Sequence, residues 1–167
     1  SFDSFTIEKG NNLYNLNKAL SSGGFSLEVQ KDYKCKKPII IYNYFTSDLD
    51  NKIINNSNQI KLNQNSELTL IESNGYFYKN ISGTQDYNSS YQNFILSSGL
   101  KFNKIEINMN LEKENSNCYI LSGLSLGKEE HQEIKTRINH MAPNCKSYQK
   151  IKNVLENDSK GAVSYTH

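Results

Sequence analysis

The chain has 167 residues and a formal net charge of +2, from 19 basic and 17 acidic residues. A charge balance this close to neutral gives no electrostatic basis for binding nucleic acid or a membrane surface, so neither partner is expected. Hydrophobic residues make up 36% of the chain and are spread thinly along it, which fits one domain with a modest core of many short elements.

The elements predicted from the N-terminus are one helix and then a series of short strands. Leu13, Leu16 and Leu20 recur at helical spacing and Gly23-Gly24 offers a stop, which predicts a helix over Asn12–Leu20. Beyond it, apolar and polar residues alternate in short runs between polar turns, as is typical of strands. The strands expected are Phe25–Val29, Pro38–Tyr42, Ile60–Leu62, Leu68–Leu70, Tyr91–Leu96 and Phe102–Leu111.

Short strands with hardly a helix among them predict an all-β fold. A sandwich, a barrel and a β-solenoid all fit this pattern, and periodicity alone does not choose among them. The chain is also rich in asparagine. Asparagine ladders inside a solenoid would explain this, but AT-rich codon use is the simpler interpretation.

The chain contains three cysteines, an odd number set far apart. This spacing does not make a disulfide framework. With neither a signal peptide nor a transmembrane run in the sequence, a reducing, cytoplasmic location is the default expectation.

A Gly-x-Ser-x-Gly motif at Gly123–Gly127 matches the nucleophile elbow of hydrolases. That elbow works only at a sharp turn from a strand into a helix, above a sheet built from alternating strands and helices. Lys128–Arg137 has some helical propensity, but the chain lacks the alternating pattern. His131 is also too near in sequence to act as the catalytic base. We therefore expect Ser125 on the outer face of a strand, with its leucine neighbours pointing inward.

Histidine and cysteine side chains near the C-terminus are candidates for a zinc or iron–sulfur site. Strand parity argues against such a site, because His131 and His140 fall on opposite faces of one strand. Cys118 alternates with apolar residues and is predicted to be a core thiol, whereas Cys145 follows in the next turn. The inward face of the strand is expected to hold Ile134, Thr136, Ile138 and His140.

The run His140–Leu155 is the most informative part of the sequence. Its spacing is His-x-x-Pro-x-Cys-x-Ser-x-Gln-x-x-Lys-x-Val-Leu, and it follows Gly123–Gly127, His131-Gln132 and Thr136. Together these motifs resemble the SufB/SufD family, the scaffold of Suf-type iron–sulfur cluster assembly, and they are more similar to SufD. The signature residues are expected to be structural, with the inward members hydrogen-bonding along the stack of coils: His140, Pro143, Cys145, Ser147 and Gln149.

The resemblance implies a right-handed parallel β-helix, or β-solenoid, with a short N-terminal helix. Residues 1–24 would be a strand and helix leading into the core, and residues 25–162 part of the β-helix itself. Residues 163–167 resemble translated sequencing-adapter read-through and are expected to be a non-native tail. Between Tyr78 and Tyr91 the chain is short and polar where the family carries further strands, so one or two coils are expected to be missing or rebuilt there.

The resemblance also implies a non-catalytic scaffold subunit that pairs with SufB and docks the SufC ATPase. No catalytic, cofactor-binding or metal-binding residue is expected in this chain, although the full complex transiently carries an iron–sulfur cluster. The Cys and His that handle the cluster in SufD, and the helical region that engages SufC, would lie beyond the end of this chain. Two alternatives remain open: a SufB-like paralogue, and an extracellular β-solenoid that binds polysaccharide through outward aromatic or acidic rows.

Overall fold

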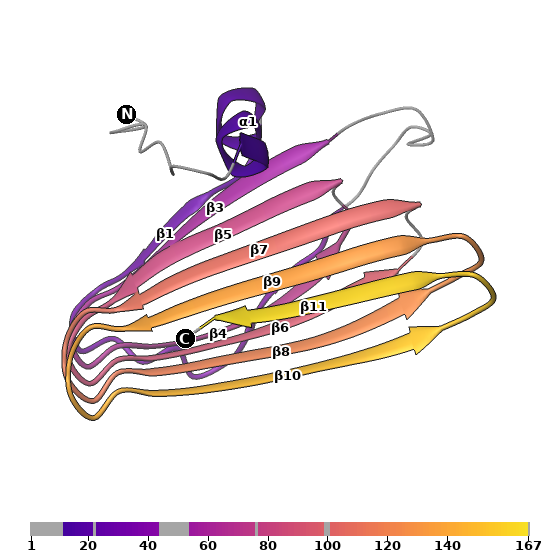
Figure 1. Cartoon of the computed structure of the whole chain (residues 1–167). Helices are drawn as coiled ribbons and strands as arrows, with labels where there is room; N and C mark the ends of the chain where they lie inside the picture. Colours follow the sequence, from indigo (N-terminus) through magenta and orange to yellow (C-terminus); the bar gives the residue numbers. More distant parts are fainter. Residues whose placement is uncertain (1–11, 22, 44–53, 76, 99–100, 167) are drawn as a thin grey trace.

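The computed structural model describes residues 12–21, 23–43, 54–75, 77–98 and 101–166. They form a parallel β-solenoid of about four turns, preceded by one short helix (Figure 1). The elements are α1 (Asn12–Leu20), β1 (Ser26–Val29), β2 (Ile39–Ile41), β3 (Asn55–Leu62), β4 (Glu67–Asn74), β5 (Tyr78–Gln85), β6 (Ser90–Ser98), β7 (Phe102–Leu111), β8 (Asn117–Leu126), β9 (His131–His140), β10 (Lys146–Leu155) and β11 (Lys160–Thr166).

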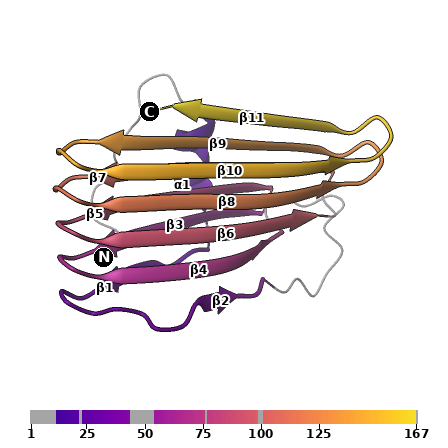
Figure 2. The ribbon, with the colours of Figure 1, turned by 90° about the horizontal axis from the view of Figure 1, so that it is seen from below.

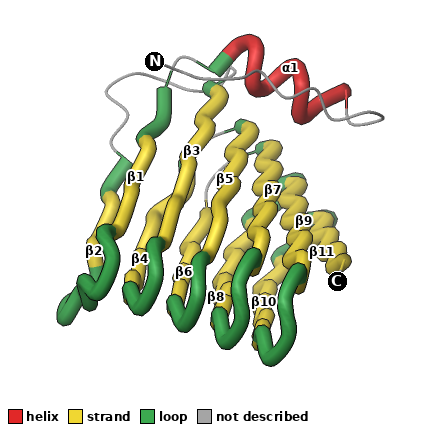
Figure 3. Tube along the Cα trace, turned by 90° about the vertical axis from the view of Figure 1, so that its left-hand side faces the viewer, coloured by secondary structure: helices red, strands yellow, loops and turns green. Residues whose placement is uncertain are grey.

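Successive strands alternate between two parallel sheets. Sheet A has the order β1-β3-β5-β7-β9-β11, and sheet B has the order β10-β8-β6-β4-β2. Figure 2 shows the strands of sheet B side by side, and Figure 3 shows the two layers and the row of turns that joins them. Each turn of the solenoid therefore adds one strand to each sheet, and the core lies between the sheets.

The core follows from the two-residue period of the strands. In β7 and β8 alternate side chains are buried, because those residues point between the sheets while their neighbours face outward. The prediction that Phe102–Leu111 places its apolar residues on one face is confirmed. The buried apolar side chains of β7 and β8 are Ile105, Ile107, Met109, Leu111, Cys118, Ile120, Leu124 and Leu126.

Helix α1 has the predicted bounds, and a polar face of the helix contacts the solenoid. It contacts sheet A at β3 and β5 through Tyr14 and Asn17, and the Asn17 Nδ2 donates to the Asn56 carbonyl at 3.3 Å. The helix lies on the outer, polar side of the sheet, so its buried face is the polar one. The leucines that recur at helical spacing consequently lie on the exposed side, with relative exposures of 36%, 53% and 61% for Leu13, Leu16 and Leu20.

The segment between Tyr78 and Tyr91, expected to lack strands, contains β5. This strand pairs with β3 on one side and β7 on the other, so it supplies a sheet A strand for its coil. Its sequence, YKNISGTQ, has few apolar residues, because its inward positions include Lys79, Gly83 and Gln85. No strand was predicted here because a polar strand inside a solenoid does not show the usual alternation of apolar and polar residues.

A buried ion pair crosses the interior between the two sheets. The Lys79 ammonium on β5 contacts the Glu72 carboxylate on β4, and both side chains are 1% exposed. The Asn93 Nδ2 on β6 donates to the other Glu72 oxygen at 3.0 Å. A carboxylate is tolerated in a protein core when each of its oxygens has a hydrogen-bond or ion-pair partner, as both oxygens of Glu72 do.

Asparagine residues recur at the turns that lead from sheet A into sheet B. Five residues at this place in successive coils have a left-handed backbone, with φ between 55° and 63°. Asparagine and aspartate adopt this conformation at lower cost than most residues. The residues are Asp32, Asn65, Asn88, Asn115 and Asn144.

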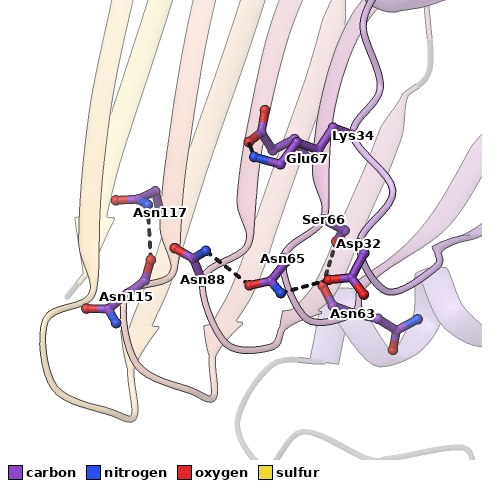
Figure 4. A network of polar contacts seen from close by, with 9 residues as sticks. All are labelled: Asp32, Lys34, Asn63, Asn65, Ser66, Glu67, Asn88, Asn115 and Asn117. Carbon is purple, nitrogen blue, oxygen red and sulfur yellow. Dashed lines mark hydrogen bonds and ion pairs between the residues drawn. The ribbon is translucent and has the colours of Figure 1, made fainter.

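Side chains at these turns also bond from coil to coil (Figure 4). The Asn65 Nδ2 donates to the Asp32 Oδ1 at 2.7 Å, and the Asn88 Nδ2 donates to the Asn65 Oδ1 at 3.1 Å. Asparagine at these turns therefore serves as a ladder, which the codon-use interpretation of the composition did not predict.

Substitutions at Asn88 should separate the backbone effect from the ladder effect. Asn88→Ala is expected to cost about 2 kcal/mol, since it combines the penalty of a left-handed alanine with a lost hydrogen bond. Asn88→Gly loses only the bond and should cost about 1 kcal/mol or less. Urea unfolding of both variants measures the difference. Equal losses would contradict a conformational role for this asparagine.

Candidate functional site

The corner between β9 and β10 contains the five signature residues. His140 ends β9, Pro143 and Cys145 lie in the turn, and Ser147 and Gln149 occupy inward positions of β10.

Hydrogen bonds at this corner join the two strands that it connects. The His140 Nε2 lies 3.0 Å from the Ser147 Oγ, and the Thr136 hydroxyl donates to the Gln149 side-chain oxygen. These bonds cross from sheet A to sheet B within one turn, rather than running along the stack as expected. His140 has the predicted parity but is exposed, because β9 ends there.

Cys145 occupies the turn position that serine holds in earlier coils. The hydroxyls of Ser66, Ser89 and Ser116 each donate to the carbonyl three residues before them, at 2.6–2.7 Å. Cys145 aligns with Ser116 in the register of β8 and β10, and its Sγ lies 3.3 Å from the Lys113 carbonyl. Cys145 is therefore a turn-packing residue in this structure.

His131 faces outward from β9, as predicted, and belongs to an aromatic stack. Its ring is stacked on Phe102 with centroids 5.3 Å apart and planes at 7°, and Phe102 lies 4.9 Å from Phe77. The stack runs from coil to coil along the N-terminal ends of the sheet A strands β5, β7 and β9. His131 is thus separated from the inward groups of the β9–β10 corner.

Ser125 lies within β8, exposed on the outer face, between buried Leu124 and Leu126. After Gly127 the chain makes a turn and enters β9 rather than a helix. The prediction that Ser125 lies on the outer face of a strand is confirmed. The motif does not form the strand-to-helix elbow that a hydrolase requires.

The three cysteines are free thiols. Within the ranges that the structure describes, no three His, Cys, Asp or Glu side chains gather closely enough to hold a metal ion. Over the same ranges, no helix is both long enough and apolar enough to cross a membrane.

Cys118 is fully buried, and the prediction of a core thiol is confirmed. Burial raises the pKa of this thiol from 9.0 to about 12, because the thiolate would lose its hydration. In the unfolded chain the thiol ionises near its ordinary pKa, while the folded chain keeps the proton. The resulting stabilisation is fully present below the unfolded pKa and is lost as pH rises towards the folded pKa.

The free energy of unfolding should accordingly fall as pH is raised from 9.0 towards 12. Burial also raises the pKa of Tyr78 and of Tyr91. These two phenols therefore add to the fall of the free energy of unfolding as pH rises above their ordinary pKa of 10.0. Cys118→Val removes only the thiol contribution, so its alkaline slope should be shallower than that of the unsubstituted protein. Urea unfolding across this pH range measures both slopes. Identical slopes would rule out the thiol as a contributor.

The outer face of sheet A carries a polar groove of about 660 Å³ that the sequence did not predict. The Lys61 ammonium pairs with Glu28 at 2.9 Å, and the Asn139 Nδ2 donates to the Asn110 Oδ1 at 2.7 Å. Hydrogen bonds from Asn63 and Lys61 hold the pKa of Glu28 below its ordinary value. Residues lining the groove include Tyr14, Glu28, Lys61, Asn110, Arg137 and Asn139.

This groove does not have the character expected of a polysaccharide-binding solenoid. Its lining contains one aromatic side chain, Tyr14, and one acidic side chain, Glu28, which is paired with Lys61. The outward aromatic or acidic row that this alternative requires is therefore not formed along the groove.

The fold defines a two-sheet parallel β-solenoid in which the thiol and imidazole of the β9–β10 corner serve turn packing. The family model for the SUF system FeS cluster assembly, SufBD core domain, matches residues 37–164. This match spans well over half of the chain, and the chain belongs to that family. None of the curated proteins compared with the chain matches it.

Proposed function

We propose that the chain is a SufD-like scaffold subunit of a SufBCD complex. Its role there is to supply a rigid stack of coils against which SufB-like and SufC-like subunits assemble while a nascent cluster is built. The subunit itself is non-catalytic and holds no resident cofactor, and the complex resides in the cytoplasm.

The main support for the SufD-like role is that the signature residues pack within the turns of the solenoid. Cys145 packs against the Lys113 carbonyl at 3.3 Å, and His140 lies 3.0 Å from Ser147. Groups engaged in this way favour a structural corner over a cluster-building site. Family membership supports the assembly role, and the spacing of the His140–Leu155 run supports SufD over SufB.

Co-expression of the tagged full-length gene product that contains this chain, together with SufB-like and SufC-like proteins from the same source, tests the proposal. The three proteins should elute together from an affinity column and then from a sizing column. Anaerobic incubation with ferric iron, sulfide and a thiol reductant should produce cluster absorption in the complex and none in the chain alone. Failure to recover a complex would refute the scaffold role.

The Cys145→Ser variant provides a matched control, because serine is the residue that this turn uses in earlier coils. A SufD-like subunit should assemble and support cluster formation equally well with serine at this position. The SufB-like alternative predicts that the isolated chain gains cluster absorption and loses it in Cys145→Ser. That result would replace the SufD-like reading with the alternative.

A further inference from the structure

The outer face of sheet B carries an apolar row that crosses four strands. Ile40, Ile71, Phe94 and Leu121 are paired in register on β2, β4, β6 and β8, and alternation points their side chains away from the core. Ile40 is 52% exposed, and the other three are partly buried. Figure 2 shows these strands side by side, and the register places the four residues next to one another across them.

A shallow depression of about 170 Å³ lies beside this row. It forms where Gly123 on β8 lies next to Leu96 on β6. Because glycine has no side chain, no side chain packs against Leu96 from that position. Leu96 is 59% exposed. A large apolar side chain from outside the chain fits this depression, because contact with it would bury both Leu96 and the floor of the depression.

One rim of the apolar surface is positively charged. Lys150 and Lys152 on β10 line the depression, and Lys146 lies on the same outward face. The strands β6, β8 and β10 contain no aspartate or glutamate. No ion pair identified among the described residues involves these lysines. The rim therefore presents positive charge to whatever covers the apolar row.

We propose that the outer face of sheet B docks an acidic amphipathic helix of a partner protein. Helices pack on open sheet faces, and in this molecule α1 already covers part of the outer face of sheet A. Apolar side chains of the partner helix would lie on Phe94 and Leu96, and its carboxylates would face Lys150 and Lys152. This proposal goes beyond the scaffold role and holds for a SufD-like or a SufB-like subunit.

Protection of the sheet edge does not account for this surface. β10 is the outermost described strand of sheet B, and lysines on an outermost strand discourage pairing with other chains. Phe94 and Leu96, however, lie on β6, two strands in from that edge. A solvent-facing apolar patch in the middle of a sheet has no protective effect, whereas it provides the buried centre that a docking interface needs.

The test measures binding of the whole chain to a fluorescein-labelled synthetic helix by fluorescence anisotropy. The probe peptide carries leucines on one face and glutamates on both flanks. Lys150→Glu/Lys152→Glu should weaken binding about tenfold, since attraction becomes repulsion at two contacts. Leu96→Asn should also weaken binding about tenfold through the loss of buried apolar area.

Two controls separate this surface from general charge effects. Lys113→Glu/Lys135→Glu makes the same change of net charge at a turn and on sheet A, and it should leave binding unchanged. A probe with lysines in place of its glutamates should bind the unsubstituted protein more weakly than the acidic probe. Circular dichroism verifies that each variant is folded.

Three results would overturn the proposal. The first is no binding of the acidic probe to the unsubstituted protein. The second is binding that Lys150→Glu/Lys152→Glu leaves unchanged. The third is binding to vesicles of phosphatidylcholine and phosphatidylserine in place of the peptide, which would assign the face to a membrane surface.

Discussion

Replacing Glu72 by leucine is expected to destabilise the protein by about 3–5 kcal/mol, because it leaves the Lys79 ammonium buried without its counter-ion. Both side chains are 1% exposed, so water cannot replace the lost carboxylate. Asn93 would also lose the acceptor that it contacts at 3.0 Å. Urea unfolding at neutral pH measures the loss.

The double variant Glu72→Leu/Lys79→Met tests the electrostatic origin of this loss. It removes both charges and fills the space with apolar atoms, so it should recover most of the lost stability. Neutralising the exposed pair with Lys34→Met is the matched control. The side chains of Lys34 and Glu67 are 59% and 48% exposed, and the expected effect is about 0–1 kcal/mol. A double variant as unstable as the single one would contradict this account.

Gly83→Ala should destabilise the protein by about 3 kcal/mol, because the inward position on β5 has no room for a methyl group. A Cβ at this glycine would lie 2.5 Å from the Ile60 carbonyl oxygen and 2.9 Å from the Met109 Cε. The methionine is able to move, but the carbonyl belongs to the backbone of the neighbouring strand β3. Thermal unfolding of Gly83→Ala should show a clear decrease in midpoint.

Gly123→Ala is the control for this substitution. A Cβ at Gly123 would meet only the Leu96 Cδ2, at 3.3 Å, on the outer face of β8. Because Leu96 is 59% exposed, its side chain has space to shift, and the variant should differ from the unsubstituted protein by less than about 0.5 kcal/mol. Equal losses at the two glycines would show that the close approach at Gly83 is unimportant.

Sequence patterns predicted the strands whose inward residues are apolar and missed β5, whose inward residues are not. Phe102–Leu111 alternates cleanly, and its predicted bounds match β7. In β5 the inward positions include Lys79 and Gly83, and each is explained only by a group that the fold brings near it. Lys79 needs Glu72 from the opposite sheet, and Gly83 needs the backbone of β3. Such pairings follow from coil stacking, which single-strand periodicity does not contain.

Strand parity predicted which way the residues of the β9–β10 corner face, but not their partners. It separated His131 from His140 correctly, yet it did not indicate that Ser147 on the next strand would meet the histidine. The apolar row on sheet B was missed for a similar reason. It runs across the strands, so each strand contributes a single residue to it. For α1, helical spacing predicted the bounds of the helix but did not indicate which of its faces would contact sheet A.

The constant offset between paired strands near the C-terminus makes the length of the molecule adjustable in whole units. Residues 29 positions apart lie side by side in three successive pairs of strands: Phe102 and His131, Asn117 and Lys146, and His131 and Lys160. Removing or duplicating one such period would leave all remaining strands in their existing alignment. A gene could thus lengthen or shorten this protein by an internal repeat without altering the spacing of the strands that remain.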